Sequence, residues 1–529
     1  MSTAPVRVVS PGPGPGSHPV VLNRRIRELT LVGASAILPL VLALAISVAV
    51  PNPSLPLVLA LAVGLLGVMG LMLSTRYEIT VMMLALYLGL LDGPVKLGIG
   101  GHETVSAVRD VLIGAVCLGA ILRMFVRREK VSLPPLSAWT LAYVAAVVVE
   151  AFNPNTRGIV KVLGGFRQLL EWVPFFFFGY AIMRSTERFR RLCIVLGVIA
   201  LANGAVSAYQ ARLSPTQLAS WGPGYSEISL GSKDLGGRNF KSEGVSRVRP
   251  PGLGSDAGFG GSIGVIALPA TMALLAMGRR RRRWAAVLLC LGAMVAVATG
   301  LGRLQVIGAV IAVGTFAALT FGAVAARGGR RALRPLLSIL GVLALALPAG
   351  AVLVSTLGSG TFSRYESIVN GEHSDNKLPE LTRIPTQLYK APFGVGLGVA
   401  GSAAGFGGIE KDELEGHSVS AETQYNFLAD EVGLPGLALW IGFAITLLVI
   451  SVKGMRRIED LDLQLGLAAM LSAFVALVVT GLYGPTLASS AYGPFFWFFA
   501  GTAAYWFAGP GRDRLSLPRL TPARAKAFA

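Results

Sequence analysis

Long apolar stretches separated by short polar connections fill most of this 529-residue chain, and they restrict its fold more than any other feature. Each stretch is long enough to cross a hydrocarbon core of about 30 Å as an α-helix. A backbone in lipid must satisfy its hydrogen bonds internally, so helices are the expected spanning elements. We therefore predict an all-α polytopic membrane protein with about 14 transmembrane helices. The stretches begin near Leu29, Ser54, Ile79, Thr104, Pro134, Val160, Arg190, Ala257, Trp284, Leu304, Pro335, Leu434, Leu463 and Ser490.

Basic residues occupy every second connection between these stretches, whereas the other connections are neutral or acidic. The basic set holds 30 of the 47 Lys and Arg residues but only 8 of the 28 Asp and Glu residues. Positive connections remain in the cytoplasm. The pattern places both termini there, and it makes the net charge of +19 a topology signal. We expect no nucleic-acid partner.

The two longest polar segments, residues 209–256 and 356–424, fall on the opposite, extracytoplasmic side. Connections of this length in a compact protein are usually functional or disordered. Residues 1–28 are expected to form a disordered cytoplasmic tail, residues 29–508 a single transmembrane domain in contact with membrane lipids, and residues 509–529 a basic cytoplasmic tail. The working parts are therefore expected to face outward.

Cysteine and histidine placement argues against a protein-held metal or cofactor. Cys117, Cys193 and Cys290 lie within or at the edges of apolar stretches, where packing is their expected role. The four histidines lack zinc-site spacing. We expect no cofactor and no metal site, and a Mg²⁺ held by carboxylates of the second outer loop is left as an open alternative.

Arginines near the outer ends of the apolar stretches are the first candidate ligand-binding residues. Arg249 opens an Arg-Pro-Pro-Gly segment, and Arg303 lies in a short hairpin between two stretches. The planar guanidinium suits bidentate phosphate contacts. The alternatives are snorkelling at the lipid boundary for Arg249 and a salt bridge to a neighbouring helix for Arg303. Arg167 stands four residues before Glu171, a helical spacing that favours a simple ion pair.

The second outer loop begins with a predicted amphipathic helix and continues into a glycine-rich stretch. Leucine and isoleucine recur at near-helical spacing from Leu378 to Leu388, with Arg383 between them, which indicates a helix at the membrane interface. Next, Gly396 and Gly398 belong to a turn that lets backbone approach a ligand or another helix. The stretch contains GxGxxG, but no predicted strand precedes it, so dinucleotide binding is not expected.

Polar residues then crowd together just before the next apolar stretch. They include His417, Glu422, Gln424 and Asn426. Several of these side chains should lie at the mouth of the helix bundle. The alternative is an ordinary polar helix N-terminus, with Glu422 favoured there by the helix dipole.

Four motifs in this order give the chain a family resemblance over roughly residues 167–483. They are the Arg-Pro-Pro-Gly segment, the Gly-Arg hairpin, a Pro-x-Gly-x-Gly-x-Gly loop and a Glu-x-Gly-x-x-Gly helix start, at residues 249–252, 302–303, 392–398 and 431–436. In these features the chain resembles the bacterial O-antigen ligase and O-antigen polymerase superfamily. The resemblance implies a GT-C-like helical glycosyltransferase of the bacterial plasma membrane. Its donor would be an undecaprenyl-pyrophosphate oligosaccharide, and its acceptor a glycan or a lipid.

One position departs from the ligase pattern, which has a histidine eleven residues before the Gly-x-x-Gly. Counting back from Gly433 reaches Glu422, and His417 stands five residues earlier. Glu422 is favoured as the catalytic base because of its position, His417 is the rival because its pKa suits neutral pH, and neither is the third possibility. Gln424 and Asn426 would orient the acceptor. The departure favours a polymerase slightly over a ligase.

The predicted chemistry follows from the donor. A lipid pyrophosphate is a good leaving group that needs charge stabilisation, which Arg249, Arg303 and Arg383, with Arg167, would supply without a metal. The main alternative is a multi-span transporter or lipid-linked sugar flippase, although no internal repeat is evident. A scaffold protein is the third alternative.

Overall fold

The computed structural model describes residues 77–99, 102–127, 133–156, 158–231, 239–242, 245–278, 283–325, 333–358, 361–362, 365, 381–400, 423–486 and 489–516. The chain divides into two compact units. The first consists of Met1–Thr80 and Ser106–Lys130, and the second of Val81–Val105 and Val131–Ala529.

The first unit contains, among the described residues, the first turn of α3 (Tyr77–Leu90) and most of α5 (His102–Arg127). On α5, Arg109 Nε lies 3.7 Å from a carboxylate oxygen of Asp110. The predicted N-terminal tail and the apolar stretches beginning near Leu29 and Ser54 lie outside the described residues.

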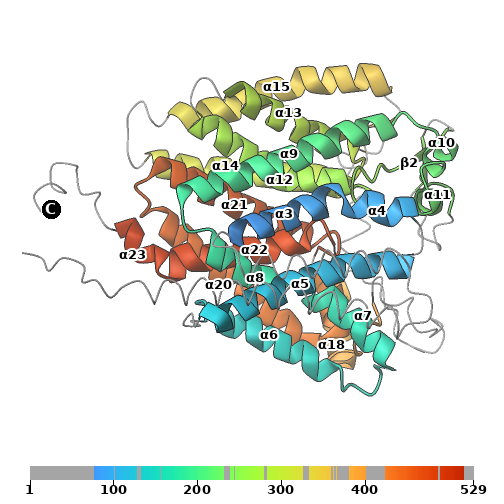
Figure 1. Cartoon of the computed structure of the whole chain (residues 1–529), viewed down its shortest axis with the longest axis vertical. Helices are drawn as coiled ribbons and strands as arrows, with labels where there is room; N and C mark the ends of the chain where they lie inside the picture. The colour runs from blue at the N-terminus through green and yellow to red at the C-terminus, as the bar shows by residue number, and fades with distance from the viewer. Residues whose placement is uncertain are drawn as a thin grey trace, which may run out of the picture. The chain divides into compact units, whose positions relative to one another are not determined.

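The second unit holds the rest of α3 and nearly all other elements. Figure 1 shows α9, α12, α13, α14, α15 and α21 running along one another, with α10 and α11 at one end and α23 at the other. The elements are α4 (Asp92–Ile99), α6 (Ser137–Glu150), α7 (Ile159–Leu170), α8 (Pro174–Ile182), α9 (Thr186–Gln210), α10 (Pro215–Ala219), α11 (Pro223–Leu230), β1 (Asn239–Ser242), β2 (Val245–Val248), α12 (Phe259–Met277), α13 (Arg283–Thr299), α14 (Arg303–Ala325), α15 (Leu333–Leu357), α18 (Ile384–Lys390), α19 (Gln424–Glu431), α20 (Gly433–Met455), α21 (Leu461–Thr480), α22 (Gly493–Ala503), η6 (Ala504–Ala508) and α23 (Gly511–Ser516).

Six of the described helices are long and apolar enough to cross a membrane, as the class of all-α membrane proteins requires. They are α9, α12, α14, α15, α20 and α21. α3 and α4 form a seventh candidate if they count as one span, because they pass the same test together and bend by 44° at their junction. α6 and α13 are shorter apolar helices. The expected total of about 14 spans remains a prediction.

A helix occupies each predicted apolar stretch that falls on described residues, although two of the stretches are not uniform. The stretch from Val160 is interrupted: α7 ends at Leu170, and α8 begins with Pro174 in its first turn. Proline lacks an N–H and suits a helix start, so the break falls there. The stretch from Ser490 becomes α22, which continues into the π-helix η6.

One short antiparallel hairpin lies within residues 209–256, the segment predicted to be the first outer loop. β1 and β2 pair with Asn239 opposite Val248 and Ser242 opposite Val245. Val245 and Val248 are apolar and Ser246 and Arg247 are polar, so the second strand lacks the alternation of apolar and polar residues that would indicate a strand. Four-residue strands are too short to stand out against the surrounding turn residues, so the sequence pattern gives no prediction of a hairpin here.

Helix α12 forms the centre of the second unit, since 94% of its membrane-length window is buried within the protein. Small residues let neighbouring helices approach closely. A Cβ on Gly204 of α9 would lie 2.5 Å from the Gly292 carbonyl oxygen of α13. Likewise, Gly179 of α8 and Gly501 of α22 each face backbone of the other helix. These contacts determine which helices are neighbours.

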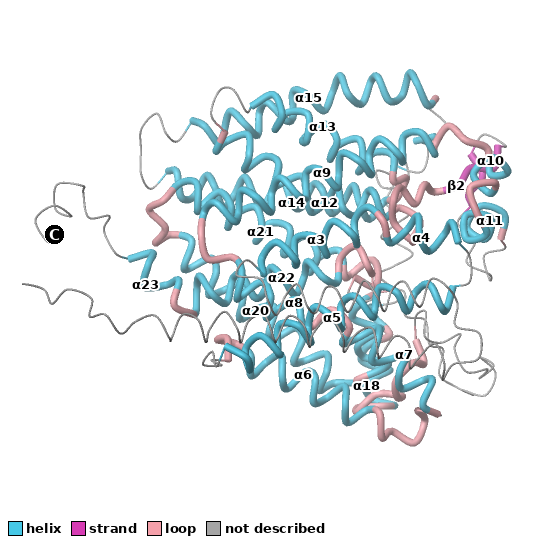
Figure 2. Tube along the Cα trace, viewed as in Figure 1, coloured by secondary structure: helices cyan, strands magenta, loops and turns pink. Residues whose placement is uncertain are grey.

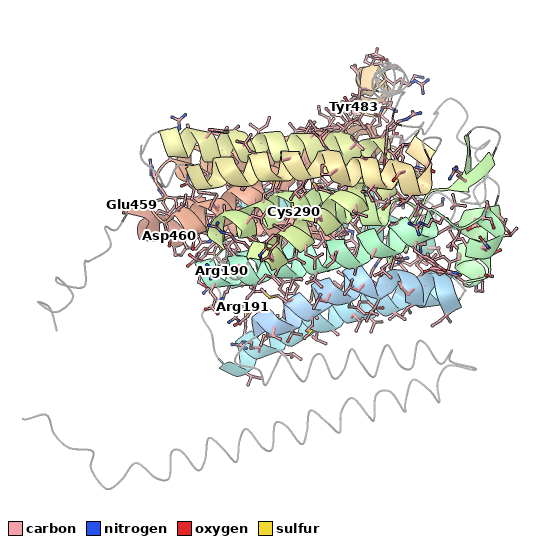
Figure 3. All side chains as sticks on the ribbon, turned by 90° about the horizontal axis from the view of Figure 1, so that it is seen from above. Arg190, Arg191, Cys290, Glu459, Asp460 and Tyr483 are labelled. Atoms are coloured by element: carbon pink, nitrogen blue, oxygen red, sulfur yellow. The ribbon has the colours of Figure 1, made fainter. Side chains whose placement is uncertain are left out.

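Charged residues gather at the end of the bundle opposite α10 and α11. Figure 3 shows Arg190, Arg191, Glu459 and Asp460 there, and Arg190 lies 3.3 Å from Asp462 in an ion pair. α21 begins beside Asp460, which caps it, and runs towards the opposite end. The tube in Figure 2 shows irregular loops at that opposite end, beside α10 and α11.

Candidate functional site

The Arg-Pro-Pro-Gly loop, residues 249–258, is anchored to α9 by two buried carboxamides. Gln210 Nε2 donates to the Gly252 carbonyl at 3.1 Å, and the Gly252 amide donates to Gln210 Oε1 at 2.8 Å. Asn203 Oδ1 accepts from the Leu253 amide at 2.9 Å. Its Nδ2 donates to the Gly89 carbonyl of α3 at 2.8 Å. The loop conformation is therefore defined by side chains that lie outside it.

The position of Arg249 is set by the preceding residue, Val248, which is buried. Val248 ends β2 and is buried in a small apolar cluster with Leu97, Leu218, Tyr225 and Ile228. This cluster joins α4, α10 and α11 to the hairpin. Arg249 follows it directly and is half-buried.

Arg303 begins α14 in the Gly-Arg hairpin, residues 300–305, as the sequence predicts, and it is half-buried. Gln305 Nε2, on the same turn, donates to the Gly258 carbonyl at 3.3 Å and to Ser262 Oγ at 3.3 Å. The Gly258 amide in turn donates to the Pro250 carbonyl at 2.9 Å. The segments that carry Arg249 and Arg303 are thus in contact.

A third segment, residues 481–490, was missed by the sequence reasoning and links this region to α19. The Gln424 amide donates to the Gly481 carbonyl at 2.8 Å. Ser490 Oγ donates to an Asp256 carboxylate oxygen at 3.3 Å. Gly484 lies against Leu304 in the Gly-Arg hairpin. A Gly-Pro turn before an apolar stretch, on the side predicted to be outer, is the signal that could have revealed it.

The start of α19 is buried, and Thr423 and Asn426 are hydrogen-bonded within the fold. Thr423 caps the helix by accepting from the Asn426 amide at 3.1 Å, which is a common N-cap arrangement. Asn426 Nδ2 donates to Gln387 Oε1 of α18 at 3.3 Å. Gln424 and Asn426 are both fully buried. Glu422 and His417, the two candidate bases, lie outside the described residues.

A short helix, α18, lies within the segment predicted to form an amphipathic helix and begins at Ile384, whereas Leu378 lies outside the described residues. Its place at the membrane interface stays a prediction. Arg383 occupies the position before its first turn and is exposed. Arg167 lies in the last turn of α7 and is half-buried, and Glu171 follows the end of that helix. Whether the guanidinium groups converge on one donor site stays a prediction.

The glycine loop, residues 392–400, lies between α7 and the α19–α20 junction. Leu397 donates its amide to Thr156 Oγ1 at 2.9 Å, and Val395 donates to the Asp430 carbonyl at 2.6 Å. Gly396 and Gly398 have φ of +107° and +70°, and both are buried. A Cβ would lie 2.6 Å from Thr156 Oγ1 and 2.7 Å from the Lys161 carbonyl oxygen, respectively. The loop therefore uses its glycines to approach other helices, one of the two predicted possibilities.

Two buried ionisable side chains, Glu431 and Lys161, meet this loop. Glu431 Oε1 accepts from the Ala400 amide at 3.0 Å, and Lys161 Nζ donates to the Gly398 carbonyl at 3.2 Å. Burial raises the pKa of Glu431 to about 8, against the lowering effect of the Ala400 and Gly398 amides and of Lys161. Sequence reasoning used Glu431 only as part of a motif.

The described residues thus bring together arginine-bearing segments and a capped, polar helix start at one end of the second unit. Guanidinium groups can bind an anionic phosphate ester, and hydroxyl and carboxamide groups can bind a sugar. The sequence matches no protein-family model and no curated protein.

Proposed function

We propose that the chain is a membrane glycosyltransferase that polymerises or ligates undecaprenyl-pyrophosphate-linked oligosaccharide in cell-surface polysaccharide biosynthesis. One observation carries the proposal. The Arg249 loop, the Arg303 hairpin and the start of α19 are all tied to residues 481–490, at one end of the second unit. Glu422, the candidate base, immediately precedes that helix start in the sequence.

The reaction needs two things that this arrangement can supply. Arginines stabilise the negative charge that develops on the departing pyrophosphate. A carboxylate or imidazole near the helix start takes the proton from the acceptor hydroxyl. Since nucleotide sugars are confined to the cytosol, a site on the outer face would use a lipid-linked donor.

The proposal includes a topology. About 14 spans cross the plasma membrane of a bacterium, with both termini in the cytoplasm and residues 209–256 and 356–424 outside. The uneven distribution of basic residues supports this arrangement. The position of α10, α11 and the hairpin opposite the cluster around Arg190 agrees with it (Figures 1 and 3).

The deciding experiment is incubation of the purified protein in liposomes with undecaprenyl-pyrophosphate oligosaccharide, alone and with an added glycan or lipid acceptor. A ladder of longer lipid-linked chains identifies a polymerase, and a single transfer to the added acceptor identifies a ligase. Absence of any new glycosidic bond under both conditions would reject the proposal.

A transporter or lipid-linked sugar flippase is the second candidate, because two predicted spans are broken. α3 and α4 bend by 44° at their junction, and α7 and α8 are separated at residues 171–173. Broken helices often line transport sites. The same liposomes test this candidate: movement of labelled lipid between leaflets without any covalent product would favour it.

A further inference from the structure

We propose that Glu431 is a positioning residue of the transfer reaction, which holds the glycine loop 392–400 between α7 and α19 and thereby sets the place of α18. The inference rests on the proposed function for its catalytic consequence, whereas its structural part can be tested independently. Glu431 is fully buried and is covered by the loop it binds.

Several hydrogen bonds hold the loop in place. Among the contacts described here, the one from the Glu431 carboxyl is the only contact that an ionisable side chain of α19 makes with the loop. The Ala400 amide at the end of the loop donates to Glu431. At its beginning, the Leu434 amide donates to the Pro392 carbonyl at 2.8 Å. On the α7 side, Lys161 holds the Gly398 carbonyl. Removing the carboxyl would leave the Ala400 amide buried without this acceptor, which destabilises the closed loop.

α18 follows the loop because it is joined to it directly. The Ala391 amide donates to the Gln387 carbonyl at the end of α18, and the Gly394 amide donates to the Ala391 carbonyl. On its other side, α18 meets α19 through Gln387 and Asn426. A shift of the loop therefore moves Arg383, at the start of α18, relative to the start of α19.

If opening of the loop exposes the buried Glu431 carboxyl to water, closure of the loop depends on pH. The raised pKa, about 8, means that closure favours the protonated side chain. By linkage, ionisation of Glu431 favours opening as the pH rises through that value. The other groups that face it are Lys161 of α7, Asp430 of its own helix and Tyr143 of α6.

The test measures amide hydrogen exchange in residues 391–400 of the full-length protein in nanodiscs, corrected for intrinsic exchange. Glu431→Gln keeps an acceptor and cannot ionise, whereas Glu431→Ala removes the acceptor. We expect protection to fall roughly tenfold in Glu431→Ala and to stay near the parent value in Glu431→Gln. Between pH 5 and 8 the parent should lose protection, with no further loss above that range, and Glu431→Gln should not. Equal protection in the parent and Glu431→Ala at every pH would overturn the proposal.

Two further variants sharpen the result. Lys161→Gln removes the positive charge that favours ionisation, so the loss of protection should move to higher pH. Glu459→Gln alters an exposed carboxylate at the opposite end of the bundle (Figure 3) and should change nothing. A Lys161→Gln transition at the parent pH would contradict an electrostatic link between the two residues.

Transfer activity should follow the exchange data: lost in Glu431→Ala and kept in Glu431→Gln, with a smaller decline towards pH 8 in Glu431→Gln than in the parent. If the parent protein transfers no sugar, the proposed function fails, and the exchange measurements still decide whether Glu431 holds the loop.

Discussion

Gln210 and Gly252 exchange a pair of hydrogen bonds across 42 residues of sequence, with the Gln210 carboxamide acting as donor and as acceptor. The side chain copies the pairing that a neighbouring strand would make with this backbone unit. It ties the Arg-Pro-Pro-Gly loop to the last turn of α9. The bonded residue, Gly252, lies three positions after Arg249 in the sequence.

Replacing Gln210 with Glu should therefore impair the loop without changing the size of the side chain. A carboxylate can still accept from the Gly252 amide, but it meets the Gly252 carbonyl with a negative charge instead of a donor. We expect a loss of about 1–3 kcal/mol in stability and a lower transfer rate, measured by thermal unfolding and by product formation. Gln217→Glu is the matched control, since Gln217 is exposed on α10 and the change preserves its capping role. Equal effects of the two changes would contradict a specific role for Gln210.

Lys variants should separate the effect of positive charge from the effect of guanidinium shape at the candidate arginines. Arg249→Lys, Arg303→Lys and Arg383→Lys keep the positive charge but lose the planar fork, so transfer should drop roughly tenfold or more while folding survives. The readout is product formation at saturating and at low donor concentration, with expression level and thermal unfolding as checks. Arg212→Lys, at an exposed position of the same outer segment, should behave like the parent. Normal activity in all three variants would exclude a guanidinium-bound pyrophosphate.

The identity of the base can be decided by two substitutions outside the described residues. Glu422→Gln should abolish transfer without reducing expression or donor binding, because the amide cannot accept the acceptor's proton. His417→Ala should retain most of the activity. Full activity of Glu422→Gln would end the carboxylate proposal, and a reversed pattern would identify His417 as the base.

The pH dependence of the free energy of unfolding should report the ionisation of the buried Glu431 carboxyl, whether or not the protein has enzymatic activity. The folded-state pKa of Glu431, about 8, lies above its ordinary value of 4.5. The folded state thus retains a proton that the unfolded state has released. The stabilisation is complete below about pH 4.5 and is lost as the pH rises to about 8, with a total effect on the order of 5 kcal/mol at most.

The measurement is the difference in unfolding temperature between the parent and Glu431→Gln, followed from pH 5 to 9. The parent should lose stability relative to the variant as the pH rises. A difference that stays constant over this range would show that Glu431 does not titrate there.

Membrane topology is open to direct labelling. Cysteines introduced at Ser220, beside α10, and at Glu459, beside α21, are both exposed. A membrane-impermeant maleimide should label Ser220→Cys in intact cells and Glu459→Cys only after permeabilisation. The parent protein reports the background from Cys117, because Cys193 and Cys290 are buried. The opposite pattern would invert the topology and remove the argument for a lipid-linked donor.

Local patterns were sufficient for most individual elements. The hairpin between Thr299 and Arg303 follows from two apolar stretches separated by Gly-Leu-Gly. α18 follows from the spacing of leucine and isoleucine. The sequence predicts one uninterrupted span from Val160, whereas the structure has a break before Pro174. The short hairpin at residues 239–248 escaped prediction because four-residue strands carry too little periodicity.

Hydropathy, glycine and charge placement are properties of single segments, so the sequence by itself determined the helical membrane class, the position of most helices and the candidate arginines. Which segments meet is a property of packing. The backbone contact of Gly204 with Gly292 sets α9 against α13. Asn203 and Gln210 therefore face the Arg-Pro-Pro-Gly loop, and Glu431 reaches a loop that precedes it by 31 residues. Only the tertiary structure decided these partners, because a buried polar group must be paired by whatever neighbour the packing brings within hydrogen-bond distance.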